Sequence, residues 1–209
     1  IAFKDLAFAV IDEQHRFGVH QRLMLAGKGE TVDVLVMTAT PIPRTLTLTT
    51  YGDMEVSRLT EKPAGRKPVD TRIIPGTRLA DVASGLKRSI ATGARVYWVC
   101  PLVEESEKID AAAAEERFDY LRKQYGEDRV GLVHGRMKGA EKDAVMAAFK
   151  DGSLDILVAT TVIEVGVDVP EASVMIIEHA ERFGLAQLHQ LRGRIGRGEK
   201  ASACVLMYG

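Results

Sequence analysis

Short apolar runs alternate with amphipathic stripes along most of the chain, and this pattern restricts the possible folds more than any other feature. A short continuous apolar run is typical of a strand that is buried on both faces, as in a parallel sheet. The predicted strands are Leu6–Ile11, Val32–Met37, Val69–Ile74, Val96–Cys100, Val130–Val133, Ile156–Ala159, Val174–Ile177 and Ala203–Tyr208. Strands that alternate with helices indicate an α/β fold, in which a parallel sheet carries helices on both faces.

The predicted helices lie between these strands, where apolar residues recur three or four positions apart. The stripes are Leu79, Val82, Leu86 and Ile90; Ala114, Phe118, Leu121 and Tyr125; Ala140, Ala144, Ala148 and Phe149; and Leu185, Leu188 and Leu191. Gly126 and Gly152 follow the second and third stripes, where glycine commonly ends a helix. A further helix is predicted at Arg44–Tyr51, after two prolines.

The run KPAGRKP at residues 62–68 contains two prolines, a glycine and three cations, and it predicts a linker. It separates residues 1–61, with only two predicted strands, from residues 69–209, where the alternation is regular. Two strands leave apolar faces and edges bare, so we expect residues 1–60 to pack on a neighbouring copy, to swap with it, or to remain mobile. Because the chain begins on Ile1 and ends on Gly209 directly after a predicted strand, we expect it to be part of a longer protein.

Composition excludes some classes of function. The net charge of the 209 residues is −1, so nucleic acid could bind only through a local basic patch. Cys100 and Cys204 lie in apolar runs and predict buried thiols in a reducing compartment, which we take to be the cytoplasm. No apolar run approaches the roughly 20 residues that span a bilayer, so no membrane partner is expected.

Polar residues follow several predicted strands directly, at Asp12-Glu13, Thr38–Thr40, His134–Arg136 and Thr160-Thr161. In an open parallel sheet, ligands bind at the carboxyl ends of the strands. Ordinary turn chemistry is the alternative explanation for any one of these sites. An acidic pair after a buried strand suits a metal–nucleotide site, since one carboxylate can bind Mg²⁺ and the next can activate water.

The segment QLRGRIGRG at residues 190–198 places three arginines among glycines. Arg194 and Arg197 are three residues apart, which puts both on one side of the chain if the segment is helical. A guanidinium group can hold a phosphate through two hydrogen bonds, and the glycines allow close approach of another surface. A solvated basic turn is the alternative interpretation.

The chain resembles the motor of the RecG family of ATP-dependent branched-DNA helicases, within superfamily two. The resemblance runs from Ala7 to Gly209 and rests on DEQHRFGVHQR, VMTATPIPRTLTLT, YGDMEVSRL, YWVCPLVEESE, VHGRM, LVATTVIEVGVDVP and QLRGRIGRG. Transcription-repair coupling factors have similar motifs and share TPIPRT, but YWVCPLVEESE and GDMEVS favour the RecG family. The resemblance implies a RecA-like second motor lobe at residues 69–209 and a truncated remnant of the first RecA-like lobe at residues 1–61.

The resemblance also implies roles in ATP hydrolysis. Asp12 would bind Mg²⁺ and Glu13 would activate water, while Gly166 and Asp168 would lie near the nucleotide. The residues that would face the γ-phosphate are Gln190, Arg194 and Arg197. Those that would couple the nucleotide to the second lobe or to DNA are Gln14, His15, Thr38 and Thr40.

The implied partner is branched DNA, such as replication forks and Holliday junctions, in recombination and repair. Thr160, Thr161 and Glu164 would lie near the DNA backbone or the cleft between the lobes. Arg136 and Lys138 could contact phosphates as well. These contacts alone would also suit a non-catalytic nucleic-acid-binding or regulatory module, which remains the alternative function.

The phosphate loop G-x-x-x-x-G-K-[ST], which the family places before DEQH, does not occur in this sequence. Its lysine and amides supply much of the hold on the nucleotide. We therefore expect the isolated chain to bind ATP weakly and to hydrolyse almost none. A metabolic nucleotide enzyme is disfavoured, because the chain contains no dinucleotide-binding glycine pattern.

Overall fold

The computed structural model describes residues 6–12, 32–38, 55–61, 66–101, 107–160, 169–198 and 200–209, with no side chains for residues 107–110. The chain forms two compact units, Ile1–Leu59 and Thr60–Gly209. The helix predicted at Arg44–Tyr51 lies outside the described residues. No helix in the described ranges combines the length and apolar character needed to cross a bilayer.

The first unit contains two parallel strands, β1 (Phe8–Ile11) and β2 (Asp33–Val36), paired from Phe8 with Asp33 to Ile11 with Val36. Both strands agree with the sequence prediction. Alternate residues of a strand point to opposite faces, so Phe8 and Val10 share one face with Leu35. These side chains are 57%, 53% and 47% exposed, whereas Ile11 on the other face is 2% exposed. One face of this small sheet is therefore apolar and bare within the chain.

The second unit is built on a six-stranded sheet in the order β3-β8-β7-β4-β6-β5, in which every pair is parallel. Its strands are β3 (Val69–Pro75), β4 (Arg95–Val99), β5 (Val130–Val133), β6 (Ile156–Ala159), β7 (Ala172–Ile177) and β8 (Ser202–Tyr208). Its helices are α3 (Leu79–Ala91), α4 (Glu107–Tyr125), α5 (Gly139–Asp151) and α6 (Leu185–Arg192). The predicted strands and helices of this unit are confirmed, with ends that shift by a few residues.

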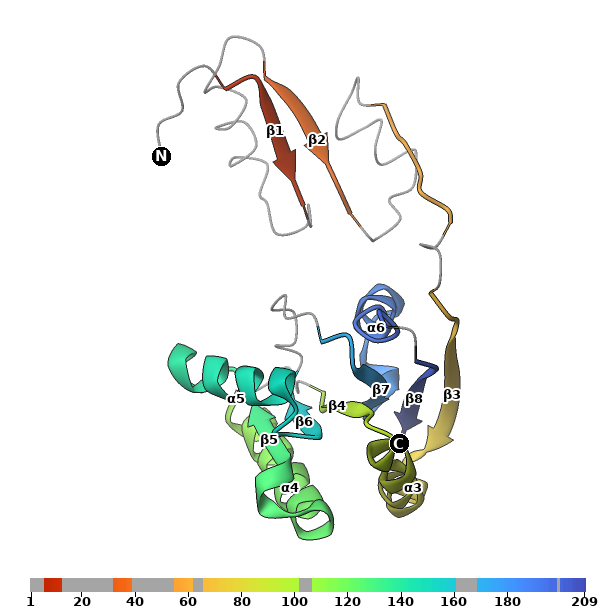
Figure 1. Ribbon diagram of the computed structural model, residues 1–209, viewed down its shortest axis with the longest axis vertical. Coiled ribbons are helices and arrows are strands. Elements are labelled where there is room, and N and C mark those ends of the chain that lie inside the picture. Colours follow the sequence, from red (N-terminus) through yellow and green to blue (C-terminus); the bar gives the residue numbers. More distant parts are fainter. Residues whose placement is uncertain are drawn as a thin grey trace. The chain divides into compact units, whose positions relative to one another are not determined.

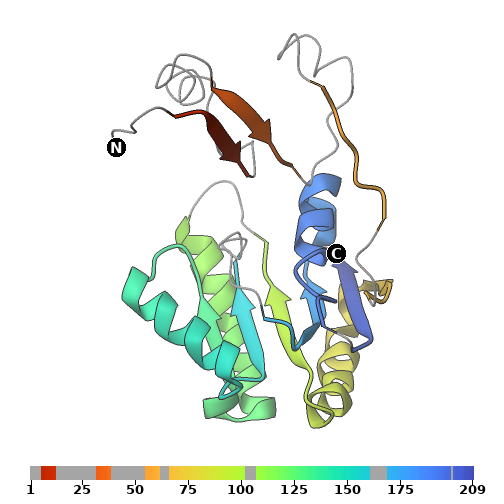
Figure 2. The same ribbon diagram turned by 45° about the horizontal axis from the view of Figure 1, so that its top comes forward.

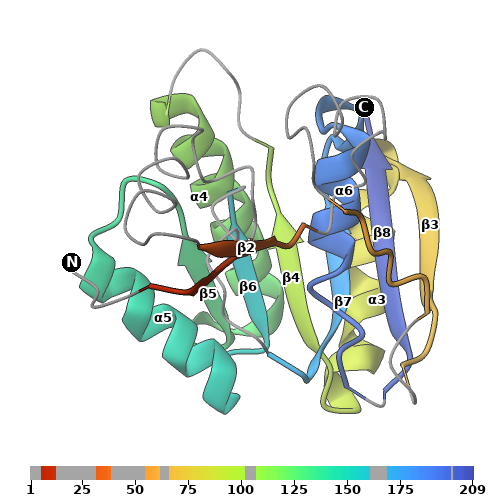
Figure 3. The same cartoon turned by 90° about the horizontal axis from the view of Figure 1, so that it is seen from above.

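Helices cover both faces of this sheet, as predicted. Figures 1 and 3 show α5 and α6 on one face and α3 and α4 on the other. The alternation along β4 explains this, because Tyr97 packs in a core with Phe149 of α5 and Leu191 of α6. Its neighbour Trp98 points the other way, into a core with Leu121 of α4.

Because the strands are parallel, the sheet of the second unit has two chemically different edges. We call the edge where the strands begin the amino edge and the edge where they end the carboxyl edge; Figure 2 shows the arrows pointing the same way. Each helix must return the chain from the carboxyl edge to the amino edge. The predicted helix ends are confirmed, since Gly126 and Gly152 follow α4 and α5 with φ of 104° and 92°.

Candidate functional site

The segment that carries Arg194 and Arg197 is a turn, residues 193–198, which we call the arginine turn. Helix α6 ends at Arg192, and the amide of Arg194 still donates to the carbonyl of Leu191 at 2.9 Å. Gly196 then adopts a φ of 71°, which a helix does not allow. The helix therefore does not continue to Arg197, and helical spacing does not place Arg194 and Arg197 on one side of the chain.

Ile195 anchors the arginine turn in the protein interior. Its side chain has no exposed surface and belongs to the core that also contains Leu191 and Phe183. Arg194 before it is half-buried and Arg197 after it is exposed. The buried Ile195 therefore anchors the backbone between the two arginines, which a freely solvated basic turn would not do.

The glycines of the arginine turn let it approach its own domain. A Cβ added to Gly196 would lie 3.0 Å from Cγ2 of Val69, the first residue of β3. A Cβ added to Gly198 would lie 2.7 Å from the carbonyl oxygen of Pro170, just before β7. The arginine turn therefore packs at the amino edge. Because Gly196 and Gly198 have no side chains, the turn can lie against the residues at the starts of β3 and β7.

Arg66 holds the arginine turn from a second side, and sequence reasoning missed this residue. Its Nε donates to the carbonyl of Gly196 at 3.1 Å and its Nη2 to the carbonyl of Gly193 at 3.3 Å. Arg197 Nε donates to the same Gly193 carbonyl at 3.3 Å. Arg66 lies inside the predicted linker, where its cation was interpreted only as part of a polar segment.

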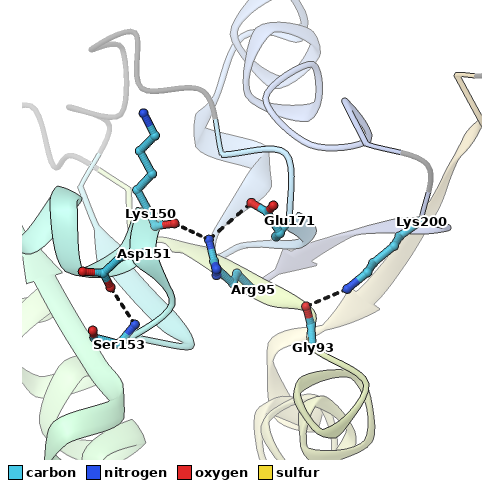
Figure 4. Close-up of polar contacts among 7 residues, drawn as sticks. All are labelled: Gly93, Arg95, Lys150, Asp151, Ser153, Glu171 and Lys200. Atoms are coloured by element: carbon cyan, nitrogen blue, oxygen red, sulfur yellow. Dashed lines mark hydrogen bonds and ion pairs between the residues drawn. The ribbon is translucent and has the colours of Figure 1, made fainter.

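Further contacts fix the amino edge beside the arginine turn, as Figure 4 shows. Arg95 Nη1, at the start of β4, donates to the carbonyl of Lys150 at 2.6 Å and lies 3.3 Å from Glu171 Oε2. Lys200 Nζ donates to the carbonyl of Gly93 at 3.0 Å. These bonds join the ends of α3 and α5 to the starts of β4, β7 and β8, so the frame behind the turn is rigid.

At the carboxyl edge, Thr160 and His134 lie side by side because the strands before them pair through Ala159 and Val133. The amide of Thr160 donates to the carbonyl of Val133 at 3.2 Å, and Thr160 is 1% exposed. Thr160 Oγ1 and His134 Nδ1 are buried and have no hydrogen-bond partner in the described part of the chain. A buried polar atom without a partner is costly, so these two atoms mark a place where a ligand could bind.

Two exposed cations, Arg136 and Lys138, stand beside these atoms on the loop after β5. Lys142 Nζ donates to the carbonyl of Gly135 at 3.0 Å, and the amide of Lys138 donates to Glu141 Oε2 at 3.2 Å. The loop is thus tied to the start of α5. A braced loop with exposed cations, next to hydroxyl and imidazole groups, is suited to bind a phosphate chain.

A partly buried ion pair lies at the carboxyl end of β7, and sequence reasoning missed it too. Arg117 Nε and Nη2 donate to the two carboxylate oxygens of Glu178 at 2.5 and 3.1 Å, and Trp98 Nε1 donates to the same carboxylate. Burial lowers the pKa of Arg117, but hydrogen bonding and the charge of Glu178 raise it more, so the net shift is upward. The signal was present in the sequence, since Arg117 stands beside Phe118 of an apolar helical stripe and Glu178 directly follows a buried strand.

The described site residues of the second unit therefore separate into two groups. Arg194 and Arg197 lie near the amino edge, while Thr160 and Arg136 follow strands at the carboxyl edge. A strand of this sheet is four to seven residues long, which at 3.3 Å per residue separates the edges by roughly 13–23 Å. Gln190 lies on α6, half-buried, one turn before the arginine turn.

The connection from Ala159 to Ala172 must join these two edges, because β6 ends at the carboxyl edge and β7 begins at the amino edge. The predicted DNA residues come first along this connection in sequence, and the predicted nucleotide residues come later. Of this connection the structure describes Thr160 and residues 169–171. The predicted site residues Thr161, Glu164, Gly166 and Asp168 lie outside the described residues.

In the first unit, Asp12 is exposed directly after β1, and Thr38 is exposed two residues after the end of β2. The carboxyl ends of these paired parallel strands bring the two residues to one edge of their sheet. The other predicted residues here lie outside the described residues, namely Glu13, Gln14, His15 and Thr40. Within the described ranges, no three His, Cys, Asp or Glu side chains group to hold a metal ion.

Comparison with known proteins gives consistent similarities. Residues 79–199 match the family described as the helicase conserved C-terminal domain. The chain is 59% identical over its whole length to the ATP-dependent DNA helicase RecG of Escherichia coli K12, of which it covers 31%. It spans about a third of the length of the curated relatives it matches.

Solved structures give the same fold. A RecG bound to a three-way DNA junction is 48% identical, with a TM-score of 0.77 over 99% of this chain and 26% of that chain. Dbp5 of Saccharomyces cerevisiae, bound to RNA and ADP BeF3, is 15% identical, with a TM-score of 0.67 over 98% of this chain and 54% of that chain. The second likeness concerns the fold alone. The predicted RecA-like parallel sheet with helices on both faces is confirmed.

Proposed function

This chain belongs to the family of the helicase conserved C-terminal domain, and we propose that it forms the second motor lobe of an ATP-dependent DNA helicase, joined to part of the first lobe. Residues 69–209 are the second lobe, residues 62–68 the linker and residues 1–61 part of the first lobe. The observation that carries the proposal is the arginine turn. Ile195 anchors this turn in the core, and Arg66 donates hydrogen bonds to two of its carbonyls.

The nucleotide is ATP, bound with Mg²⁺. Asp12 suits the metal, because its carboxylate is exposed directly after the carboxyl end of β1. Bound Mg²⁺ would neutralise charge on the phosphates. Glu13 would orient the attacking water. Residues that meet the phosphates or lie near the nucleotide are Gln190, Arg194, Arg197, Gly166 and Asp168.

The anchored turn explains why this lobe is useful to ATP hydrolysis. Phosphoryl transfer is catalysed by positioning and by neutralisation of developing charge, and an arginine supplied across a cleft contributes about 10³–10⁵-fold in related systems. Arg197 is exposed, yet its backbone is fixed to the core within two residues. Such a guanidinium group can be presented to a partner surface without losing its position. The chain contains no phosphate loop, so we expect the isolated chain to be inactive.

DNA binds at the carboxyl edge of the second lobe. Thr160 Oγ1 is buried without a partner among the described residues, and Arg136 and Lys138 are exposed beside it. A phosphate oxygen would satisfy the threonine hydroxyl while the cations neutralise neighbouring phosphates. Thr161 and Glu164 follow in the same connection and would contribute to this contact. Each such contact positions the strand without reading its sequence.

Coupling follows from the separation of the two sites. The connection from β6 to β7 joins the proposed DNA edge to the proposed nucleotide edge, so it would be the segment that couples the two sites. In the first lobe, Gln14, His15, Thr38 and Thr40 would sense the nucleotide in the same way. Closing and opening of the lobes on ATP would then move the bound strand.

We propose branched DNA as the substrate, with action at replication forks and Holliday junctions in recombination and repair. The similarity to a RecG solved on a three-way DNA junction supports this choice. We also propose a bacterial cytoplasmic location, which is supported by the bacterial relatives and by two buried thiols, Cys100 and Cys204, that form no disulfide.

The test is ATP hydrolysis and DNA binding by the full-length protein on forked and linear DNA of equal length. The forked DNA should stimulate hydrolysis more strongly. Thr160→Val and Arg136→Ala should weaken DNA binding, and Arg136→Ala should reduce the slope of log affinity against log salt by about 1. Arg72→Ala, an exposed arginine on β3, is the matched control. Equal stimulation by both DNAs would reject the branched substrate, and DNA binding without hydrolysis would favour the non-catalytic module.

A further inference from the structure

Arg66 connects the segment between the two units to the arginine turn. It stands seven residues after Leu59, the last residue of the first unit, and three residues before β3 begins at Val69. We propose that Arg66 is a positioning residue for ATP hydrolysis, which sets the place of Arg197 relative to the linker. This inference rests on the proposed function and adds to it a residue outside the family motifs that were identified.

The contacts show why Arg66 can do this. Its planar guanidinium group donates to the carbonyls of Gly196 and Gly193, at 3.1 and 3.3 Å, and so spans the buried anchor Ile195. The two acceptors lie 130 and 127 residues away in sequence. A rigid fork with two bonds fixes orientation as well as distance, which a flexible ammonium group with one bond does not.

Arg66 also shares an acceptor with the residue it positions. The carbonyl of Gly193 receives Nη2 of Arg66 and Nε of Arg197, each at 3.3 Å. Removing Arg66 takes away one bond to the Gly193 carbonyl and one bond to the Gly196 carbonyl. Ile195 and the close packing of Gly196 on Val69 keep the turn in the core, so Arg66→Ala should change the orientation of the turn and leave it folded.

A purely structural role would give a different result from a positioning role. Loss of a structural contact lowers stability and weakens ATP binding, DNA binding and turnover together. Loss of a positioning contact lowers kcat, while the KM for ATP and the affinity for DNA change little, because Arg197 would act mainly in the transition state. The two roles can therefore be separated by steady-state kinetics.

The experiment uses the full-length protein with forked DNA and compares Arg66→Ala, Arg66→Lys and the control Arg72→Ala. Arg66→Ala should lower kcat by about 10-fold or more, with the KM for ATP within about 3-fold of wild type and an unchanged Kd for DNA. Arg66→Lys should recover part of the loss, because one of the two bonds can reform. Arg72→Ala should match wild type.

A double-mutant cycle with Arg197→Ala separates failure of the positioning role of Arg66 from failure of the proposed function. If Arg66 acts through Arg197, Arg66→Ala should reduce kcat by less than about 2-fold in the Arg197→Ala background. Multiplying effects, or an unchanged kcat in Arg66→Ala with a folded protein, would overturn the positioning role. If Arg197→Ala itself hydrolyses ATP normally, the proposed function fails instead.

Discussion

Arg117 and Glu178 form a two-pronged ion pair inside the second unit, with side chains that are only 20% and 13% exposed. The guanidinium group of Arg117 also lies over the rings of Trp98 and Tyr120, at 5.9 and 5.2 Å from their centroids. The pair borders an open pocket of about 460 Å³ at the carboxyl ends of β3, β7 and β8. It connects α4 to the end of β7 at the carboxyl edge.

We expect Glu178→Leu to destabilise the protein by about 3 kcal/mol, because it leaves the charge of Arg117 buried without its partner. Adding Arg117→Met should recover most of that loss, since two apolar side chains then replace the pair. Urea unfolding measures the free energy of unfolding of Glu178→Leu and of the double variant. The exposed Arg72–Asp70 pair is the control, with side chains 69% and 56% exposed, and Asp70→Ala should cost at most about 1 kcal/mol. A double variant as unstable as Glu178→Leu would contradict this prediction.

Gly152 and Gly85 should respond in opposite ways to alanine. Gly152 has a φ of 92°, and its added Cβ would lie 2.7 Å from Arg95 Nη2, the side chain that fixes the amino edge in Figure 4. Gly152→Ala should therefore lower the free energy of unfolding by about 1–2 kcal/mol. Gly85 lies within α3 with nothing within 4 Å of its added Cβ, so Gly85→Ala should raise it by about 0.5–1 kcal/mol. Thermal unfolding of both variants checks the pair, and equal effects would contradict it.

The buried thiols predict loss of stability at high pH. Burial raises the pKa of Cys204 from 9.0 to about 11, and burial together with the charge of Glu178 raises the pKa of Cys100 as well. Between pH 9 and 11 the unfolded chain releases a proton that folded Cys204 retains, so the free energy of unfolding falls as pH rises. Below pH 9 the contribution is complete.

The check is the difference in unfolding free energy between wild type and a Cys100→Ala/Cys204→Ala variant at several pH values. The difference should be constant below about pH 8 and should shift in favour of the variant above about pH 9, because only wild type carries these thiols. A difference that stays flat up to pH 11 would show that neither thiol is shielded in the folded state.

The apolar face of β1 and β2 predicts self-association of the isolated chain. Phe8, Val10, Leu35 and Met37 are 57%, 53%, 47% and 41% exposed. A contiguous apolar face of this kind tends to be covered in solution. Analytical ultracentrifugation should detect dimers or larger species, and Phe8→Ser/Val10→Ser should shift them toward monomer. Monomeric wild type at concentrations of about 100 μM would oppose this prediction.

The strands and helices were predictable because burial on both faces leaves a direct mark in the sequence. Val130–Val133 and Ile156–Ala159 are continuous apolar runs, and both became strands with the predicted bounds. Thr160 was identified because it follows such a run. The sequence could not show that its hydroxyl would be buried without a partner, since that depends on how β5 and β6 pair.

The two edges of the sheet were harder to predict. Arg194 and Arg197 were identified by spacing, but the left-handed Gly196 ended the helical geometry that the spacing assumed. The bonds of Arg66 to Gly193 and Gly196 cross more than half of the chain, and no local pattern encodes them. Long-range polar contacts of this kind follow from the sheet order, which a single sequence does not specify.

The central claim is that the arginine turn acts on the γ-phosphate of ATP in the full-length protein. The most direct measurement is DNA-stimulated ATP hydrolysis by Arg197→Ala, with nucleotide binding followed in parallel by a fluorescent ATP analogue. Arg78→Ala, an exposed arginine paired with Asp81 at the start of α3, is the control. The account predicts that Arg197→Ala lowers kcat on the order of 10³-fold and still binds nucleotide. Hydrolysis by Arg197→Ala at the rate of the control would contradict it.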